Sequence, residues 1–313
     1  MERTTGVEPT PGFIATLTEQ MAAVAQELSV WVRTAPRTLV ELEQRTLEVT
    51  KELGNTMLAG ACGLLAASPP APERPCACGQ TATYRRHRPA QVTTVLGPIA
   101  IARAYYYCAQ CRHGHAPLDQ QLGYCAGSTS AGLDAVLALL GATADSFAEA
   151  VTLLDTLTLV RVCPNLARAA TERLGQDRQA AEQQTATAAW GDGTLPTAIA
   201  APARLYLSLD GVLVHTAGGW REDKLGTVST TVARPVATRP GAVELHAQEL
   251  SFVGAVADAA TFGQLLWCAA ARRGALTAAE VVIVADGAHW IWNLAAEHFP
   301  AATQLVDWYH ASP

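Results

Sequence analysis

Hydrophobic positions recur with a helical period through the first part of the chain. Residues 12–34 and 38–66 place apolar side chains three or four positions apart, with Pro36 between the two runs. This pattern predicts a helical N-terminal segment, residues 1–67, that serves in packing or self-association. The proline-rich stretch SPPAPERP, residues 68–75, predicts the end of that segment.

The pattern then changes twice. In residues 76–125, the stretch AQVTTVLGPIAIARAYYYC is rich in strand formers, which predicts a β-hairpin with Gly97-Pro98 at its bend. In residues 129–187 the helical period returns, with candidate helices at 130–142, 145–157 and 164–187. Two short helices followed by a longer one are compatible with a helix-turn-helix DNA-binding segment.

From residue 203 to 313 strands and helices alternate. Three strand patterns come first, then a helix that begins at Asp258 and ends at Gly274. EVVIVADG predicts a strand buried on both faces, and a second helix and the strand ATQLVDWYH follow. The whole chain is therefore expected to be a multidomain α+β protein: helical N-terminus, β module, helical segment and α/β domain.

Composition changes this picture little. Half of the 313 residues are hydrophobic, so most of the chain is expected to fold. No apolar run is long enough to cross a bilayer, and the N-terminus lacks the basic-then-apolar pattern of a signal peptide. We therefore expect a soluble protein of the cytoplasm without a membrane partner.

Charge is distributed unevenly. The formal net charge is −6, yet residues 74–120 contain arginines against a single acid, Asp119. A basic block in an acidic protein favours a module that contacts DNA phosphates. Arg168 and Arg173 lie near one face of the third candidate helix, which fits either a recognition helix or an ordinary solvated face. The candidate DNA contacts are Arg85, Arg86, Arg88, Arg103, Arg112, Arg168 and Arg173.

Four of the eight cysteines form two close pairs, Cys76 and Cys78 in CAC, and Cys108 and Cys111 in CAQC. Two such pairs on two turns can place four thiolates tetrahedrally around a structural Zn²⁺ ion. Such a metal would also stabilise a β segment this small, as in a zinc ribbon. The alternative is a set of buried or reactive thiols without a metal.

Two aspartates follow strand patterns directly and precede glycine, Asp210 after LYLSL and Asp286 after VVIVA. Carboxylates on neighbouring strands can hold two Mg²⁺ ions about 4 Å apart and so promote phosphodiester chemistry. The alternative is that each Asp-Gly pair only forms a turn. The order of strands around the two aspartates favours the metal site and an RNase H-like fold.

Three blocks of the chain carry a family resemblance: YYYCAQCRHGHAPLDQQLG, LSLDGVLVHTAGGWREDKLGTV and VADGAHWIWNLAAEHFPAATQLVDWYHA. In this order they resemble the ISKra-type bacterial insertion-sequence transposases, over roughly residues 76–311. The resemblance implies a DDE transposase with an RNase H-like catalytic domain, acting with Mg²⁺ on transposon ends and target DNA as a homo-oligomer. Asp210 matches the first metal-binding aspartate and Asp286 the second. DWYH resembles an Asp/Cys-x₂-His element, which makes His310 a candidate neighbour of the active site.

The chain departs from the family in one respect. Such enzymes carry a third carboxylate, a Glu, on a helix well beyond this element, whereas the sequence ends at Pro313. We therefore expect an incomplete RNase H-like domain, residues 203–313, with impaired DNA cleavage and strand transfer. The alternative function is a catalytically inactive DNA-binding regulator derived from a truncated transposase.

Overall fold

A computed structural model of the chain describes residues 11–66, 69–124, 127–239 and 241–307. The chain divides into two compact units, residues 1–176 and 177–313. The division falls inside α6, so that residues 177–191 of this helix belong to the second unit.

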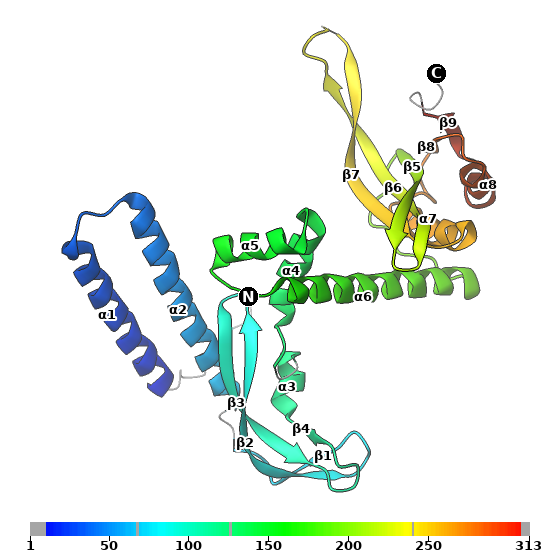
Figure 1. Cartoon of the computed structure of the whole chain (residues 1–313). Coiled ribbons are helices and arrows are strands. Elements are labelled where there is room, and N and C mark those ends of the chain that lie inside the picture. Colours follow the sequence, from blue (N-terminus) through cyan, green and yellow to red (C-terminus); the bar gives the residue numbers. More distant parts are fainter. Residues whose placement is uncertain (1–10, 67–68, 125–126, 240, 308–313) are drawn as a thin grey trace, which may run out of the picture. The chain divides into compact units, whose positions relative to one another are not determined.

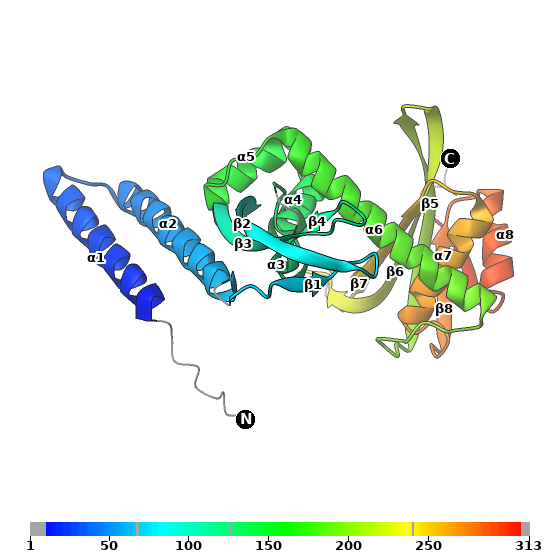
Figure 2. The ribbon, with the colours of Figure 1, turned by 90° about the horizontal axis from the view of Figure 1, so that it is seen from below.

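The first unit contains a helical hairpin, a small antiparallel sheet and a group of further helices. Helices α1 and α2 run side by side as a hairpin, as Figures 1 and 2 show from two directions. The elements are α1 (Pro11–Thr34), α2 (Leu39–Ala66), β1 (Glu73–Pro75), β2 (Thr81–Thr94), β3 (Gly97–Tyr107), β4 (Gly114–His115), α3 (Pro117–Leu122), α4 (Ala131–Thr143), α5 (Phe147–Thr158) and α6 (Pro164–Gly191). These bounds confirm the helices and the β-hairpin predicted from the sequence.

Side-chain caps explain where several of these helices begin. At the start of α2, the Thr38 hydroxyl accepts from the Glu41 backbone N–H, and the Glu41 carboxylate accepts from that of Thr38. This reciprocal pair satisfies two donors that the helix itself leaves without partners. Ser130 and Ser146 are the N-cap residues of α4 and α5, and each hydroxyl accepts from the backbone N–H three residues further on.

Strands β1 to β4 form an antiparallel sheet in chain order. The bend between β2 and β3 lies two residues earlier than the predicted Gly97-Pro98. Gly97 pairs with Thr94 as the first residue of β3, and Val95 and Leu96 form the turn. Gly97 takes a φ of +112°, which explains why glycine follows this turn directly.

The second unit is built on a five-stranded sheet in the order β7-β6-β5-β8-β9. Strands β5, β6 and β7 are antiparallel neighbours, whereas β8 and β9 run parallel to β5. The elements are β5 (Arg204–Thr216), β6 (Gly219–Pro235), β7 (Val243–Ala255), α7 (Ala259–Arg272), β8 (Glu280–Ala285), α8 (His289–His298) and β9 (Thr303–Val306). The predicted order of strands and helices is confirmed, and the fold is mixed α/β.

One face of this sheet forms the core of the second unit. Along β5, the buried Leu205, Leu207 and Leu209 alternate with the exposed Ser208 and Asp210. The buried set packs with residues of α7, α8 and the last turns of α6. Helices α7 and α8 lie against the sheet in Figures 1 and 2, and Figure 1 shows the β6–β7 ribbon extending beyond the other strands.

The helices that the structure describes include none long and apolar enough to cross a membrane.

Candidate metal centre and carboxylate edge

Two tight turns of the first sheet each carry a pair of cysteines. Between β1 and β2, the Cys76 N–H donates to the Gln80 carbonyl over 2.7 Å, and Gly79 takes a φ of +82°. Between β3 and β4, the Cys108 N–H donates to the His113 carbonyl over 2.9 Å. The antiparallel pairing of β2 with β3 brings the two turns together.

The four thiols converge at one point. The Sγ atoms of Cys76, Cys78, Cys108 and Cys111 all lie within 4.8 Å of one another. Cys76 Sγ lies 3.5 Å from Cys111 Sγ, and Cys78 Sγ lies 3.7 Å from Cys108 Sγ. Zn–S bonds of about 2.3 Å in a tetrahedron require S–S distances of roughly 3.8 Å. The cluster therefore has the donor set and spacing to hold a metal such as zinc.

The thiols perturb one another electrostatically. The Cys111 backbone N–H lowers the pKa of Cys108 to about 7. The His113 backbone N–H acts in the same direction on Cys111, but burial and the neighbouring thiols outweigh it and raise the pKa of Cys111 to about 12. Concentrating negative charge on four sulfurs is unfavourable unless a cation lies among them.

The middle of the β2–β3 hairpin presents an exposed basic surface. Arg85, Arg86 and Arg88 are exposed on β2. The Arg85 guanidinium carbon lies 5.6 Å from the ring centroid of Tyr107, and that of Arg88 lies 4.6 Å from the ring centroid of Tyr105. We call these five residues the arginine–tyrosine face. Stacking on an aromatic ring holds a guanidinium in place while leaving its N–H groups free for an anion.

Arg103 does not belong to this face, although it pairs with Arg88 across the hairpin. Its side chain is only 8% exposed, and its Nε donates to the Asp119 carboxylate of α3. Its Nη1 donates to the Arg88 carbonyl over 2.8 Å. The prediction that Arg103 contacts DNA is therefore wrong: the guanidinium is buried and neutralised, and it fastens α3 to the sheet.

The remaining arginines of the predicted DNA-binding set differ in their surroundings. Arg112 lies in the turn between the second cysteine pair and β4, with a φ of +56°. On α6, the half-exposed Arg173 pairs with Asp134 of α4, whereas Arg168 lies 3.9 Å from Glu172 on its own helix. Arg173 thus contributes to helix packing, and Arg168 keeps most of its charge toward solvent.

The two predicted catalytic aspartates lie at the same level on neighbouring strands. In the parallel pair β5–β8, Leu209 is opposite Ala285, and Asp210 and Asp286 are the residues that follow. The prediction placed Asp210 at a strand end, but β5 continues to Thr216 as a hairpin with β6. The strand that ends beside Asp210 is the neighbouring β8, whose last residue is Ala285.

A third aspartate continues the row. Ala285 is opposite Val306 in the parallel pair β8–β9, and the N–H of the next residue, Asp307, donates to the Ala285 carbonyl over 2.9 Å. Asp307 is the first residue of DWYH, the element in which the sequence analysis named His310 as a candidate neighbour of the active site. His310 lies outside the described residues.

Both predicted catalytic carboxylates are oriented locally. Asp210 Oδ1 accepts from the Gly211 N–H over 2.7 Å, and Asp286 Oδ1 accepts from the Ala288 N–H over 2.8 Å at the start of α8. The second contact is the turn that Asp-Gly was expected to form as the alternative. Each carboxylate has a second oxygen, so a structural turn and a ligand role are compatible.

Sequence reasoning missed a buried lysine beside this row. Lys224 on β6 is opposite Gly211 and only 7% exposed. Its Nζ donates to Glu222 Oε2 over 2.7 Å and lies 5.2 Å from the ring centroid of Trp290 on α8. Lysine is seldom buried without a partner, and Lys224 is one of only two lysines in the chain. The rarity of lysine in the chain was the only feature of the sequence that could have drawn attention to Lys224.

Comparison of the chain with protein-family models and with curated proteins found no match.

Proposed function

We propose that this chain is a DNA-binding protein of the transposase type, which holds DNA at the arginine–tyrosine face and carries an Mg²⁺-dependent phosphodiester site at Asp210 and Asp286. Zinc at the four cysteines would be structural in this proposal. The proposal extends to cleavage at transposon ends followed by strand transfer.

The pairing register of β5 and β8 carries the catalytic part of the proposal. The two carboxylates follow opposite residues of adjacent parallel strands, an arrangement in which two side chains can share metal ions, and Asp210 is exposed to solvent. Mg²⁺ prefers such oxygen ligands and keeps several waters. When bound, the ions would activate a water or a 3′-hydroxyl and stabilise the leaving oxygen. The protein's own part is to fix the two carboxylates at one level.

The sheet supports the same proposal. An order of β7-β6-β5-β8-β9, with the first three strands antiparallel and the last two parallel to the central β5, is the order expected of an RNase H-like fold. The first candidate ligand lies on the central strand and the second after the fourth strand in sequence, as the resemblance to the ISKra-type transposases implies.

The experiment is a plasmid-nicking assay with the full chain. Supercoiled DNA is incubated with Mg²⁺ or Ca²⁺ and the protein, and DNA retention is measured in parallel on a filter. Asp210→Asn and Asp286→Asn are expected to lower Mg²⁺-dependent nicking at least 100-fold while DNA retention changes less than twofold. Asp192→Asn is the matched control, because Asp192 is an exposed aspartate of the same unit away from β5 and β8. Nicking that survives both catalytic substitutions contradicts the assignment.

A DNA-binding regulator without cleavage activity is the second candidate. The exposed arginine–tyrosine face favours it, because this face lies in the first unit and needs no carboxylate to hold a phosphate. The same assay separates the two functions. A regulator retains DNA but produces no nick with Mg²⁺, whether or not Asp210 and Asp286 are replaced.

A further inference from the structure

The α1–α2 hairpin has a charged side that one ion pair marks. Arg45 of α2 pairs across the hairpin with Glu27 of α1, and its Nη1 also lies 3.2 Å from Glu48 Oε2. Glu27 and Arg45 therefore lie on the same side of the two helices. Further along the hairpin, Phe13 of α1 packs against Gly60 of α2, where a Cβ would collide with the ring. This contact belongs to the seam between the helices.

The other side of the seam is apolar and exposed. An α-helix advances about 100° per residue, so positions 14, 21 and 32 of α1 lie about 120° around the helix from Glu27. Positions 39, 57 and 64 of α2 lie about equally far from Arg45, in the same sense. Antiparallel helices are related by a two-fold axis perpendicular to their length, so equal rotations point to the same side of the hairpin. We call this side the hairpin face, and its side chains are 38% to 70% exposed: Ile14, Met21, Val32, Leu39, Met57 and Leu64.

The hairpin face carries almost no charge and is not covered by the small sheet. Thr18 and Ala25 of α1, and Thr50 and Ala61 of α2, lie between its apolar residues, and Glu43 is the one charged residue at this spacing in the described part of the hairpin. In Figures 1 and 2, α1 lies on the side of α2 away from the sheet. No residue of α1 whose exposure the structure describes is buried. Because helices gain most of their stability from packing an apolar face, we expect this one to be covered.

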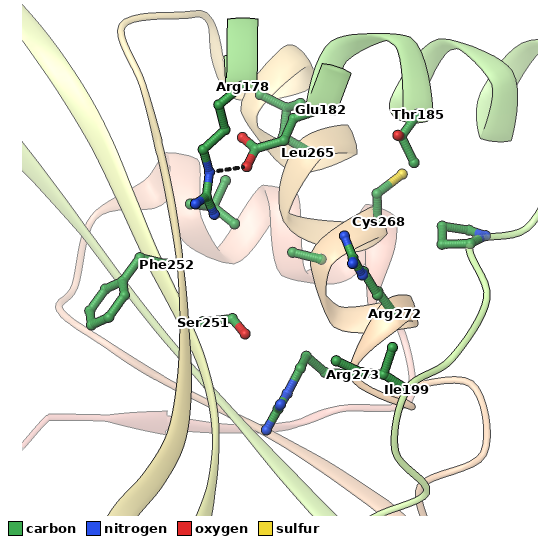
Figure 3. Close-up of a pocket in the computed structure, with 13 residues that line it drawn as sticks. Arg178, Glu182, Thr185, Ile199, Ser251, Phe252, Leu265, Cys268, Arg272 and Arg273 are labelled. Carbon is green, nitrogen blue, oxygen red and sulfur yellow. Dashed lines mark hydrogen bonds and ion pairs between the residues drawn. The ribbon is translucent and has the colours of Figure 1, made fainter. Parts of the chain in front are cut away.

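Exposed apolar side chains of the second unit are arranged differently. Around the opening shown in Figure 3, Ile199 and Phe252 lie on opposite sides, and Arg178 and Arg273 line the same opening. Arg178 pairs with Glu182 over 2.9 Å, the contact drawn as a dashed line. Charged groups among apolar ones oppose burial by another protein, because their desolvation is unfavourable. The hairpin face lacks this obstacle.

From these observations we infer that the hairpin face binds the same face of a second copy of this chain, so that two hairpins form a four-helix bundle. A face with a single charge can meet itself with little like-charge repulsion. The two-fold relation of α1 and α2 also lets α1 of one copy pack on α2 of the other.

The size of the hairpin face fits this occupant. The 24 residues of α1 extend over about 36 Å, and two helices side by side are about 20 Å wide. The face therefore measures roughly 700 Å² per copy, close to the roughly 800 Å² per partner of a stable interface. The inference concerns the first unit alone and rests neither on DNA binding nor on Asp210.

The test is sedimentation velocity of the full chain without DNA, across the micromolar range. Wild type is expected to sediment as a dimer, with twice the chain mass of 32.9 kDa. The double variant Met21→Glu, Met57→Glu should weaken dimerisation at least 100-fold, because it buries carboxylates without partners inside the bundle. Ile14→Glu, Leu64→Glu, a second pair on the same face, should have the same effect.

Gln26→Glu, Gln44→Glu is the matched control, because it adds the same two charges at exposed positions away from the hairpin face. It should leave the dimerisation affinity within threefold. Far-UV circular dichroism checks that each variant keeps its helices, and either pair of glutamates on the face that does so suffices for the comparison. The inference is overturned if wild type remains a monomer throughout the range, if glutamates on the hairpin face leave the dimer intact, or if the control dissociates it equally.

Discussion

His298 lies edge-on to Trp190, with ring centroids 5.1 Å apart, and neither of its ring nitrogens has a hydrogen-bond partner in the described part of the chain. The imidazole is 7% exposed and occupies the space next to Gly263, where a Cβ would approach Nε2 to 2.4 Å. A buried ring with no acceptor for a second proton must be neutral in the folded protein.

This burial predicts that the second unit loses stability in mild acid. Burial lowers the pKa of His298 from its ordinary 6.5, opposed in part by Glu297. The unfolded chain therefore takes up the proton first as the pH falls. The contribution is complete above about pH 6.5 and decreases below it, until the pH passes the folded-state pKa, with a slope of at most about 1.4 kcal/mol per pH unit. Urea unfolding at pH 5.5 and 7.5 measures it, followed by tryptophan fluorescence.

His298→Leu should remove this slope, because leucine does not titrate. His289→Leu is the control, since His289 is exposed on the same helix and should leave the slope unchanged. Six of the seven tryptophans lie at residue 190 or beyond, so the fluorescence reports mainly on the second unit. An equal slope in wild type and His298→Leu contradicts the assignment.

The cysteine cluster predicts one bound metal ion per chain. Cys78→Ser should reduce the zinc content of protein purified from zinc-supplemented cells from about one ion per chain to less than a tenth, because a hydroxyl is a poor ligand for Zn²⁺. The measurement is atomic emission on the purified protein. Cys163→Ser is the matched control, an exposed cysteine outside the cluster. Zinc-free wild-type protein, or full zinc in Cys78→Ser, refutes the metal site.

Local elements could be predicted from the sequence because their causes are local. The helix from Leu39 begins where Thr38 and Glu41 can cap one another, and the helix from Ala131 begins after Ser130. The cysteine cluster was predictable for a similar reason, since each pair lies within one turn. The two turns come together because β2 and β3 pair as a hairpin. That hairpin was itself predictable from two runs of strand formers in the sequence.

Long-range consequences could not be predicted in the same way. Arg88 and Arg103 are both hairpin arginines, and only the placement of Asp119 on α3 makes one buried and the other exposed. Asp210 and Asp286 lie side by side because strands more than 70 residues apart in sequence pair in one register, and no local pattern encodes that register. The same applies to the burial of Lys224 and His298, where packing partners from other elements decide.

The ion pair of Arg103 with Asp119 predicts a large cost for removing either partner alone. Arg103→Met should destabilise the first unit by about 3 kcal/mol, because it leaves a largely buried carboxylate unpaired. The double variant Arg103→Met, Asp119→Leu should recover most of that loss. Arg86→Met, an exposed position on the same hairpin, should cost less than about 0.5 kcal/mol. Calorimetric unfolding of wild type, Arg103→Met, Asp119→Leu and the double variant measures the cycle, with Arg86→Met alongside, and equal losses in the single and double variants refute the prediction.

The arginine–tyrosine face predicts how DNA binding depends on salt. Each phosphate contact that is lost should reduce the slope of log affinity against log salt by about 0.9 for duplex DNA, so Arg85→Gln, Arg88→Gln should flatten the slope by about 1.8. The measurement is a filter-binding titration of duplex DNA between about 50 and 200 mM salt. Arg161→Gln, Arg239→Gln carries the same change in net charge at side chains that are 86% and 73% exposed elsewhere. If that control flattens the slope equally, the chain binds DNA through its overall charge rather than through Arg85 and Arg88.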